Sequence, residues 1–294
     1  MRFRALTKSV GRDIVGLMSI TVAAFYKFVT IDEPETLRAS VEAACVQNGI
    51  LGTILVASEG INATISGREE AIASLLLWLR SDPRFSVLAV KMSFAETEPF
   101  KRLKVRIKPE IVTFGVPGIN PADQAGTYVA PEAWNALIRD PDVLVIDTRN
   151  GYEVAIGTFE GAIDPKTDAF GDFPEYVARN LDPARHKRVA MFCTGGIRCE
   201  KASAYLLTQG FPEVYHLEGG ILKYLETVPE EASLWRGECF VFDGRVALQH
   251  GVEEGTHAHC AVCGYPVGKA VEKEASQLSP QCPNCRARNS GCNA

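Results

Sequence analysis

The first third of the chain contains two kinds of hydrophobic pattern. Short apolar runs are rich in β-branched and aromatic residues, and longer segments have apolar residues at helical spacing, which would place them on one face of a helix. Four of these runs predict strands and two predict helices. In chain order they are a strand at 21–31, a helix at 34–48, strands at 51–57 and 61–65, a helix at 68–80 and a strand at 85–94. The order β-α-β-β-α-β is typical of a ferredoxin-like or acylphosphatase-like α+β domain, in whose core we expect Cys45.

From residue 127 onward, predicted strands and helices alternate. The strands lie at 143–147, 188–192 and 214–217. The helices lie at 131–138, at 174–180, at 200–207 and from the glycines at 219–220 through residue 225. This alternation predicts a parallel sheet with helices on both faces, and it places catalytic groups at the carboxyl ends of the strands. His216 is a lone histidine in an apolar strand, so we expect it to be packed rather than catalytic.

These patterns divide the 294 residues into five segments. They are an N-terminal extension at 1–17, an α+β domain at 18–98, a basic segment and linker at 99–126, an α/β domain at 127–230 and a cysteine-rich region at 231–294. Basic residues before an apolar run at 14–25 faintly resemble a secretory signal, but no small-residue cleavage site follows them, and Met18 is an alternative start to Met1. No run reaches the ~20 apolar residues of a membrane span, so we expect no membrane partner.

Composition narrows the compartment and the class of partner. The net charge of −5 means that nucleic-acid binding would require a local basic patch. Six of the nine cysteines follow residue 230. An odd number of cysteines in so uneven a distribution indicates metal and thiol chemistry in a reducing cytoplasm rather than a disulfide framework.

A local basic patch occurs just after the first domain. Five basic residues fall within eight positions, namely Lys101, Arg102, Lys104, Arg106 and Lys108. In an extended segment, alternation places the last three on one face and the apolar residues between them on the other. Two interpretations are open: a solvated edge strand whose charges prevent aggregation, and a stripe that contacts RNA phosphates.

The clearest chemistry lies in residues 193–199, between a predicted buried strand and a predicted helix. The partial positive charge of the helix N-terminus and the full charge of Arg198 both favour a thiolate at Cys193. Cys199 is either a resolving thiol or merely the first residue of the helix. The residues expected to surround a bound anion are Thr194, Gly195, Gly196 and Ile197. The two glycines allow backbone amides to approach the anion closely.

The end of the chain contains two Cys-x-x-Cys pairs separated by 18 residues. They are formed by Cys260 with Cys263 and by Cys282 with Cys285. Four thiolates at this spacing predict one tetrahedral structural Zn²⁺, which would stabilise a tail too short for a core of its own. The possible substitute ligands are Cys239, His257, His259 and Cys292.

The loop from Cys193 to Arg198 resembles the active-site loop of the rhodanese (sulfurtransferase) superfamily. Similar segments of that family occur at 147–153, 161–163 and 217–220. The resemblance implies a rhodanese-like domain at 127–230, a persulfide on Cys193 surrounded by loop amides, and a structural role for Asp147. Four residues separate Cys193 from Arg198, whereas the related cysteine phosphatases have five, so the shorter loop favours sulfur chemistry.

Across nearly its whole length the chain resembles the tRNA uridine(34) hydroxylases. The segments that carry this resemblance are Ala57-Ser58-Glu59-Gly60-Ile61-Asn62, Pro99-Phe100-Lys101-Arg102-Leu103-Lys104-Val105-Arg106, the loop at 193–199, Gly237-Glu238-Cys239-Phe240-Val241-Phe242-Asp243 and the paired Cys-x-x-Cys motifs. The resemblance implies an oxidoreductase that converts the wobble uridine of tRNA to 5-hydroxyuridine with O₂ as co-substrate. The active-site residue that it implies is Cys193.

A tRNA substrate favours the phosphate-contacting interpretation of the basic segment and makes the anticodon loop the expected partner. We expect the Cys193 thiolate to add to C6 of uridine, or to carry an oxidised sulfur that reacts there, with Arg198 and the loop amides stabilising the anion. The sequence indicates no organic cofactor, and the electron or sulfur donor is not identified. The alternatives are a sulfurtransferase that does not act on tRNA, and a non-catalytic RNA-binding or zinc-stabilised adaptor with a vestigial loop.

Overall fold

The computed structural model describes residues 19–269, 282 and 284–286. The predicted extension at 1–17 and the choice between Met1 and Met18 lie outside the described residues, as does Cys292. Within the described part, no helix combines the length and the apolar character needed to cross a membrane.

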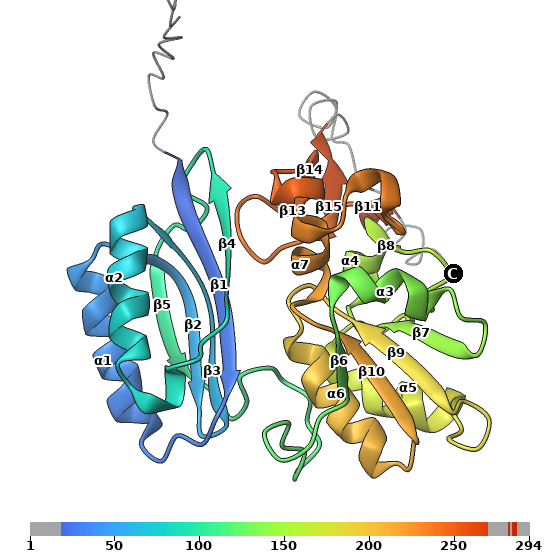
Figure 1. The fold of residues 1–294 in the computed structure, drawn as a ribbon. Helices are drawn as coiled ribbons and strands as arrows, with labels where there is room; N and C mark the ends of the chain where they lie inside the picture. The colour runs from blue at the N-terminus through green and yellow to red at the C-terminus, as the bar shows by residue number, and fades with distance from the viewer. Residues whose placement is uncertain (1–18, 270–281, 283, 287–294) are drawn as a thin grey trace, which may run out of the picture.

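The first domain is a five-stranded sheet with two helices on the face away from the second domain (Figure 1). The strand order is β4-β1-β3-β2-β5. The elements are β1 (Ile20–Phe28), α1 (Pro34–Gln47), β2 (Leu51–Ala57), β3 (Gly60–Gly67), α2 (Glu69–Arg80), β4 (Val90–Ala95) and β5 (Leu103–Ile107). The predicted α+β fold class is confirmed.

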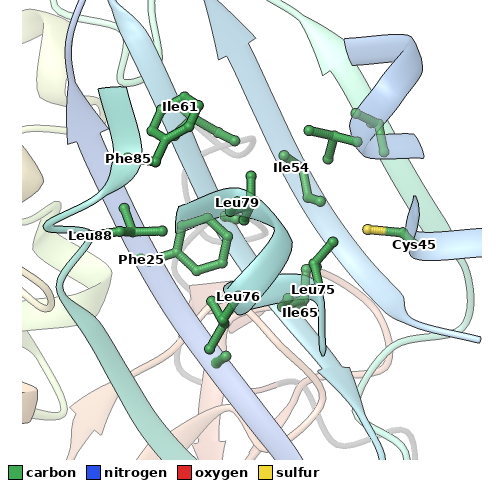
Figure 2. Close-up of a cluster of buried hydrophobic side chains, with 14 of the residues drawn as sticks. Phe25, Cys45, Ile54, Ile61, Ile65, Leu75, Leu76, Leu79, Phe85 and Leu88 are labelled. Carbon is green, nitrogen blue, oxygen red and sulfur yellow. The ribbon is translucent and has the colours of Figure 1, made fainter. Parts of the chain in front are cut away.

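The core of this domain lies between the sheet and the helices, as Figure 2 shows. Cys45 of α1 is fully buried there, which confirms its predicted packing role. The predicted strand at 85–94 is wrong in its first half. Pro83–Phe85 form a 3₁₀ turn because the Asp82 side chain accepts the Arg84 N–H, and Phe85 is buried in the core, so β4 begins only at Val90.

The basic segment is part of this first sheet and not of a linker outside it. β5 pairs in parallel with β2, with Lys104 beside Thr53 and Arg106 beside Leu55. This finding moves the end of the first domain beyond the predicted boundary at residue 98. The predicted alternation buries Val105, but Ile107 is 39% exposed because an edge strand has a neighbour on one side only.

The second domain contains a parallel sheet with helices on both faces, as predicted (Figure 1). Its strand order is β6-β10-β9-β7, with α5 and α6 packed on one face and α3 and α7 on the other. The elements are β6 (Thr127–Val129), α3 (Pro131–Ile138), β7 (Val143–Asp147), α4 (Gly151–Val154), β8 (Gly157–Phe159), α5 (Phe173–Asn180), β9 (Arg188–Phe192), α6 (Ile197–Thr208), β10 (Glu213–Leu217) and α7 (Gly220–Thr227).

The C-terminal region folds onto the second domain through β11 (Trp235–Gly237), which pairs with β8. Two further hairpins follow. They are β12 (Cys239–Phe240) with β13 (Ala247–Leu248), and β14 (His257–His259) with β15 (Pro266–Gly268).

Partly buried polar contacts join the first domain to the second. The Tyr26 hydroxyl donates to Glu200 Oε1 at 2.7 Å, and the buried Lys201 ammonium lies 2.9 Å from Glu59 and 2.6 Å from Glu110. Glu200 and Lys201 belong to the first turn and a half of α6. The first domain is therefore fixed directly against the helix that begins at the Cys193 loop.

Candidate active site

Cys193 lies immediately after β9, between the N-termini of α6 and α7. Its carbonyl oxygen accepts the Ile221 N–H at 3.0 Å, and the Thr194 carbonyl accepts the Leu222 N–H at 3.1 Å. Gly220 must be glycine here, because it has φ +68° and an added Cβ would lie 2.6 Å from the Cys193 carbonyl oxygen. The loop that holds the sulfur is therefore anchored to two helix starts.

The environment of the Cys193 sulfur stabilises a thiolate. The Gly196 N–H donates to Sγ at 3.1 Å. Burial by itself raises the pKa of this thiol, but the Cys199 thiol, the Arg198 charge and the N–H groups of Cys199 and Gly196 outweigh it and lower the pKa to about 5. The Cys193 side chain is thus an anion at neutral pH.

Cys199 lies in the first turn of α6 and is fully buried. Burial raises the pKa of its thiol well above the usual range, and the adjacent Cys193 thiolate raises it further. Its sulfur also lies 3.5 Å from the Thr148 hydroxyl. Cys199 therefore remains a protonated donor beside an anionic acceptor. It is the third residue of α6, which begins at Ile197, and not the first residue of the helix. Its role as a resolving thiol stays a prediction.

Arg198 carries the full charge that the sequence predicted, and it is paired with a carboxylate that the sequence did not predict. Its guanidinium forms two hydrogen bonds with the Glu153 carboxylate, at 2.6 and 2.8 Å, and both side chains are buried. Burial alone raises the pKa of Glu153, but the Arg198 charge and hydrogen bonds reverse the effect and keep it lowered. Sequence reasoning noted Glu153 only as part of a family pattern and missed its place in the site.

The structure also shows the positions of the other loop residues and of Asp147, for which a structural role was predicted. Thr194 is buried, with its hydroxyl 3.4 Å from Arg198 Nη2, while Gly195 and Ile197 are partly exposed. Asp147 is buried and accepts two hydrogen bonds from the Arg149 guanidinium at 2.9 and 2.6 Å.

His216 is also buried. Its Nε2 lies 3.1 Å from the Gly126 carbonyl oxygen, and burial lowers its pKa to about 4, so it is a neutral packed residue.

Two residues of the first domain, which sequence reasoning missed, lie beside the starts of α6 and α7: Tyr26 at Gly196 of the Cys193 loop, and Lys91 at Gly219. The Tyr26 hydroxyl is 2.8 Å from the position of a Cβ at Gly196, so a larger residue there would collide with it. The Lys91 ammonium lies 5.3 Å from the centre of the Tyr26 ring, and its Cε would be 3.6 Å from a Cβ at Gly219. Burial lowers the pKa of Lys91, although the Cys193 thiolate and Glu200 partly offset this.

The strand register connects the basic segment with these two residues. One row of neighbouring positions across the sheet is Lys104, Thr53, Thr64, Ala24 and Lys91, and the next is Arg106, Leu55, Asn62 and Tyr26. Residues paired in this way point to the same face of a sheet. Lys104 and Arg106 therefore share a face with the residues that reach the Cys193 loop, about 15–20 Å away at ~4.8 Å per strand.

Of the other basic residues in the segment, Lys101, Arg102 and Lys108 are exposed.

The four C-terminal cysteines of the paired motifs come together in space. Their sulfur atoms all lie within 4.8 Å of one another, with Cys263 and Cys282 at 3.4 Å. Tetrahedral Zn–S bonds of about 2.3 Å place sulfur atoms about 3.8 Å apart, so this donor set can hold a metal ion.

The possible substitute metal ligands that lie in the described part of the chain have other partners. Cys239 is buried in the core of the second domain, His257 Nδ1 lies 2.7 Å from Glu238, and His259 Nδ1 lies 3.0 Å from the Gly264 carbonyl oxygen.

A parallel α/β domain with a Cys-x₄-Arg loop between two helix starts defines a rhodanese-like protein of the sulfurtransferase type, with enzymatic character. Comparison with known families supports this class. A UPF0176 acylphosphatase-like domain matches residues 20–111, a rhodanese-like domain matches 130–227 and a rhodanase C-terminal domain matches 236–294. The chain thus has the architecture of the UPF0176 family, which is of the tRNA uridine hydroxylase type.

Several solved structures are similar to parts of the chain. A rhodanese-like domain from Anabaena sp. has 17% identity, covers 37% of this chain and 78% of its own, and has a TM-score of 0.31. A rhodanese-related protein from Thermoplasma volcanium has 20% identity, with coverages of 35% and 93% and a TM-score of 0.29. The polysulfide-sulfur transferase homodimer from Wolinella succinogenes has 28% identity, with coverages of 34% and 74% and a TM-score of 0.29.

Proposed function

We propose that the chain hydroxylates the wobble uridine of tRNA at C5 with O₂, using the sulfur of Cys193. The observation that carries the proposal is the joining of the two domains at the loop. Tyr26 of the acylphosphatase-like domain lies against the Cys193 loop at Gly196, and Lys91 lies beside Tyr26 and Gly219, at the start of α7. Both residues share a sheet face with the basic strand β5. Sulfur transfer between small molecules needs neither the added domain nor the basic strand.

The sheet face offers a path for an RNA backbone. Lys104 and Arg106 would contact phosphates at one edge, while the nucleotide to be modified reaches the Cys193 loop at the other. The wobble base lies in a single-stranded loop, so it can be extruded at small cost. Lys101, Arg102 and Lys108 extend the positive charge beyond the strand.

The chemistry begins with the Cys193 thiolate. Its addition to C6 of uridine makes C5 nucleophilic, and C5 then attacks O₂ to give a C5 hydroperoxide. The Cys199 thiol takes the outer oxygen as a sulfenic acid, which leaves the hydroxyl on C5. Elimination of Cys193 from C6, with loss of the C5 proton, restores the ring.

The electron balance closes with the two cysteines. The released Cys193 thiolate attacks the Cys199 sulfenic acid, forming a disulfide and water. In sum, uridine, O₂ and two thiols give 5-hydroxyuridine, water and one disulfide. A thiol reductant, whose identity is not needed for a single turnover, then restores both cysteines. Arg198 keeps its pairing with Glu153 throughout, and its charge stabilises the Cys193 thiolate.

We also propose that Cys260, Cys263, Cys282 and Cys285 hold a structural Zn²⁺. Four thiolates fill the coordination sphere, so the ion takes no part in catalysis and stabilises the short tail. Reduced cysteines at both sites fit a cytoplasmic location.

The test of the function is nucleoside mass spectrometry of tRNA from a host that lacks wobble hydroxylation. Expression of the wild-type chain should give 5-hydroxyuridine, and expression of Cys193→Ser should not. Equal amounts of the product from both would refute the role of Cys193, and its absence from both would refute the function.

A sulfurtransferase that does not act on tRNA is the second candidate, and the burial of Cys193 favours it. A persulfide would carry the reactive sulfur about 2 Å outward from the buried Sγ. This candidate predicts thiocyanate formation from thiosulfate and cyanide, dependent on Cys193, without any change in tRNA.

A further inference from the structure

Phe242 is a large aromatic residue exposed beside the candidate active site. Its side chain is 60% exposed, whereas the two residues before it, Phe240 and Val241, are buried. An exposed phenylalanine is unremarkable when it stands alone on a surface, so its position relative to the Cys193 loop decides whether it has a role.

The segment that carries Phe242 runs along the Cys193 loop. The Arg198 guanidinium carbon lies 5.9 Å from the centre of the Phe242 ring, within the range of a cation–π contact. The Thr194 hydroxyl lies 3.4 Å from the Phe240 carbonyl oxygen. The Phe242 ring therefore borders the loop at Arg198, the residue that pairs with Glu153 and stabilises the Cys193 thiolate.

The backbone on which Phe242 sits is held rigidly between the two domains. The Asp243 carboxylate pairs with Arg245, whose Nη1 donates to the Ser93 hydroxyl of β4 at 2.7 Å. The Gly244 N–H donates to the Pro99 carbonyl oxygen at 3.0 Å. These contacts fix the turn that follows Phe242, next to β4 and to the sheet face that faces the second domain.

An aromatic neighbour sets the orientation of the Phe242 ring. Phe240 meets Phe242 edge to face, with ring centres 5.1 Å apart and an interplanar angle of 83°. A phenylalanine held by a rigid turn and an aromatic neighbour, with more than half of its surface open, presents a flat apolar face without the cost of ordering it on binding.

We propose that Phe242 is the platform on which the extruded uracil of the wobble nucleotide stacks before it reaches the Cys193 sulfur. The proposal rests on the function proposed above and names the residue that positions its base. Aromatic rings bind bases by stacking, which needs no hydrogen-bond partner. A pyrimidine on the exposed part of the Phe242 ring is also close to the Arg198 charge.

The experiment is a binding cycle that removes the ring and the base in turn, in a Cys193→Ser background that prevents turnover. The ligands are an anticodon stem–loop RNA with uridine at position 34 and the same RNA abasic at that position. Without a Phe242 substitution, the uridine RNA should bind about 5- to 150-fold more tightly than the abasic RNA, the range for stacking of one base. Phe242→Ala should reduce this ratio to about one, and Phe242→Trp should keep it.

Trp78→Ala is the matched control, because Trp78 is an exposed aromatic residue on α2, on the other side of the first sheet. It should leave the ratio unchanged. A ratio that survives Phe242→Ala would overturn the platform alone and leave the tRNA substrate in place. Failure of every variant to bind either RNA would overturn the proposed function together with the platform.

Discussion

The ionisation of Cys193 is the property that the structure predicts most sharply. A pKa of about 5 makes about 99% of the residue thiolate at pH 7, whereas an ordinary thiol of pKa about 8.5 is only about 3% ionised. The rate of alkylation of Cys193 by iodoacetamide should therefore reach half of its plateau near pH 5. It should be flat from about pH 6.5 to 9.

The Cys199 thiol makes the largest favourable contribution against the cost of burial, which raises the pKa. A hydrogen bond to a charged group is worth about 1.5–3 kcal/mol, which corresponds to about one to two pH units. Cys199→Ala removes the donor and should raise the midpoint by that amount. Cys199→Ser keeps a hydroxyl donor and is the matched control, with a midpoint close to that of the wild-type protein.

The assay is quantitative mass spectrometry of the peptide that contains Cys193, after brief alkylation at pH values from 4 to 9.5. The midpoint and not the plateau rate is the test, because burial slows the reagent at every pH. A wild-type midpoint between pH 8 and 9 would refute the thiolate, and equal midpoints for Cys199→Ala and Cys199→Ser would refute the role of the Cys199 hydrogen bond.

The lowered pKa of Cys193 also predicts how folding stability depends on pH. The folded pKa lies below that of the unfolded chain, so the unfolded state binds more protons between about pH 5 and 8.5 and stability rises with pH there. This contribution is complete above about pH 8.5 and is lost as the pH falls through about 5. Cys193→Ser should remove it, so urea unfolding of the two proteins should differ in its pH slope.

Three further predictions concern the parts of the protein that support the site. Glu153→Gln should destabilise the protein by about 3–5 kcal/mol in urea unfolding, because it leaves the buried Arg198 charge without its counter-charge; a loss below 1 kcal/mol would contradict the buried ion pair. Reversal of charge at both Lys104 and Arg106 should weaken tRNA binding and reduce the slope of log K against log salt by about 1.4, two contacts at 0.7 each; an unchanged slope would return β5 to the role of a solvated edge strand. Chelation should release one zinc per chain and lower the melting temperature, and a purified protein without zinc would contradict the metal site.

Local signals were sufficient to predict most of the fold. The predicted helix at 131–138 has the same bounds in the structure and begins at a proline. The Cys193 loop follows a buried strand, as the apolar run at 188–192 predicted. The parallel sheet follows from the alternation of strands and helices. The prediction of a strand at 85–94 was wrong in its first half, where Phe85 and Leu88 are buried although the chain forms a turn. Periodicity alone does not distinguish apolar residues buried in a turn from those buried in a strand.

The site was only partly predictable because its remaining parts come from distant segments. Glu153 and Arg198 are 45 positions apart, and Tyr26 and Glu200 are 174 apart. A buried arginine beside a cysteine needs a carboxylate, and that requirement could have pointed to Glu153 in the pattern after Asp147. No signal in β1 or β4 marks Tyr26 or Lys91, since their place depends on how the two domains meet.

The most direct measurement of the central claim is a single turnover with ¹⁸O₂. Purified protein, reduced and then freed of reductant, is mixed with unmodified tRNA, and the nucleosides and the Cys193 peptide are analysed by mass spectrometry. The account predicts 5-hydroxyuridine carrying one ¹⁸O atom, with one Cys193–Cys199 disulfide for each product formed. Product without the label, or labelled product in equal yield from Cys193→Ser, would contradict it.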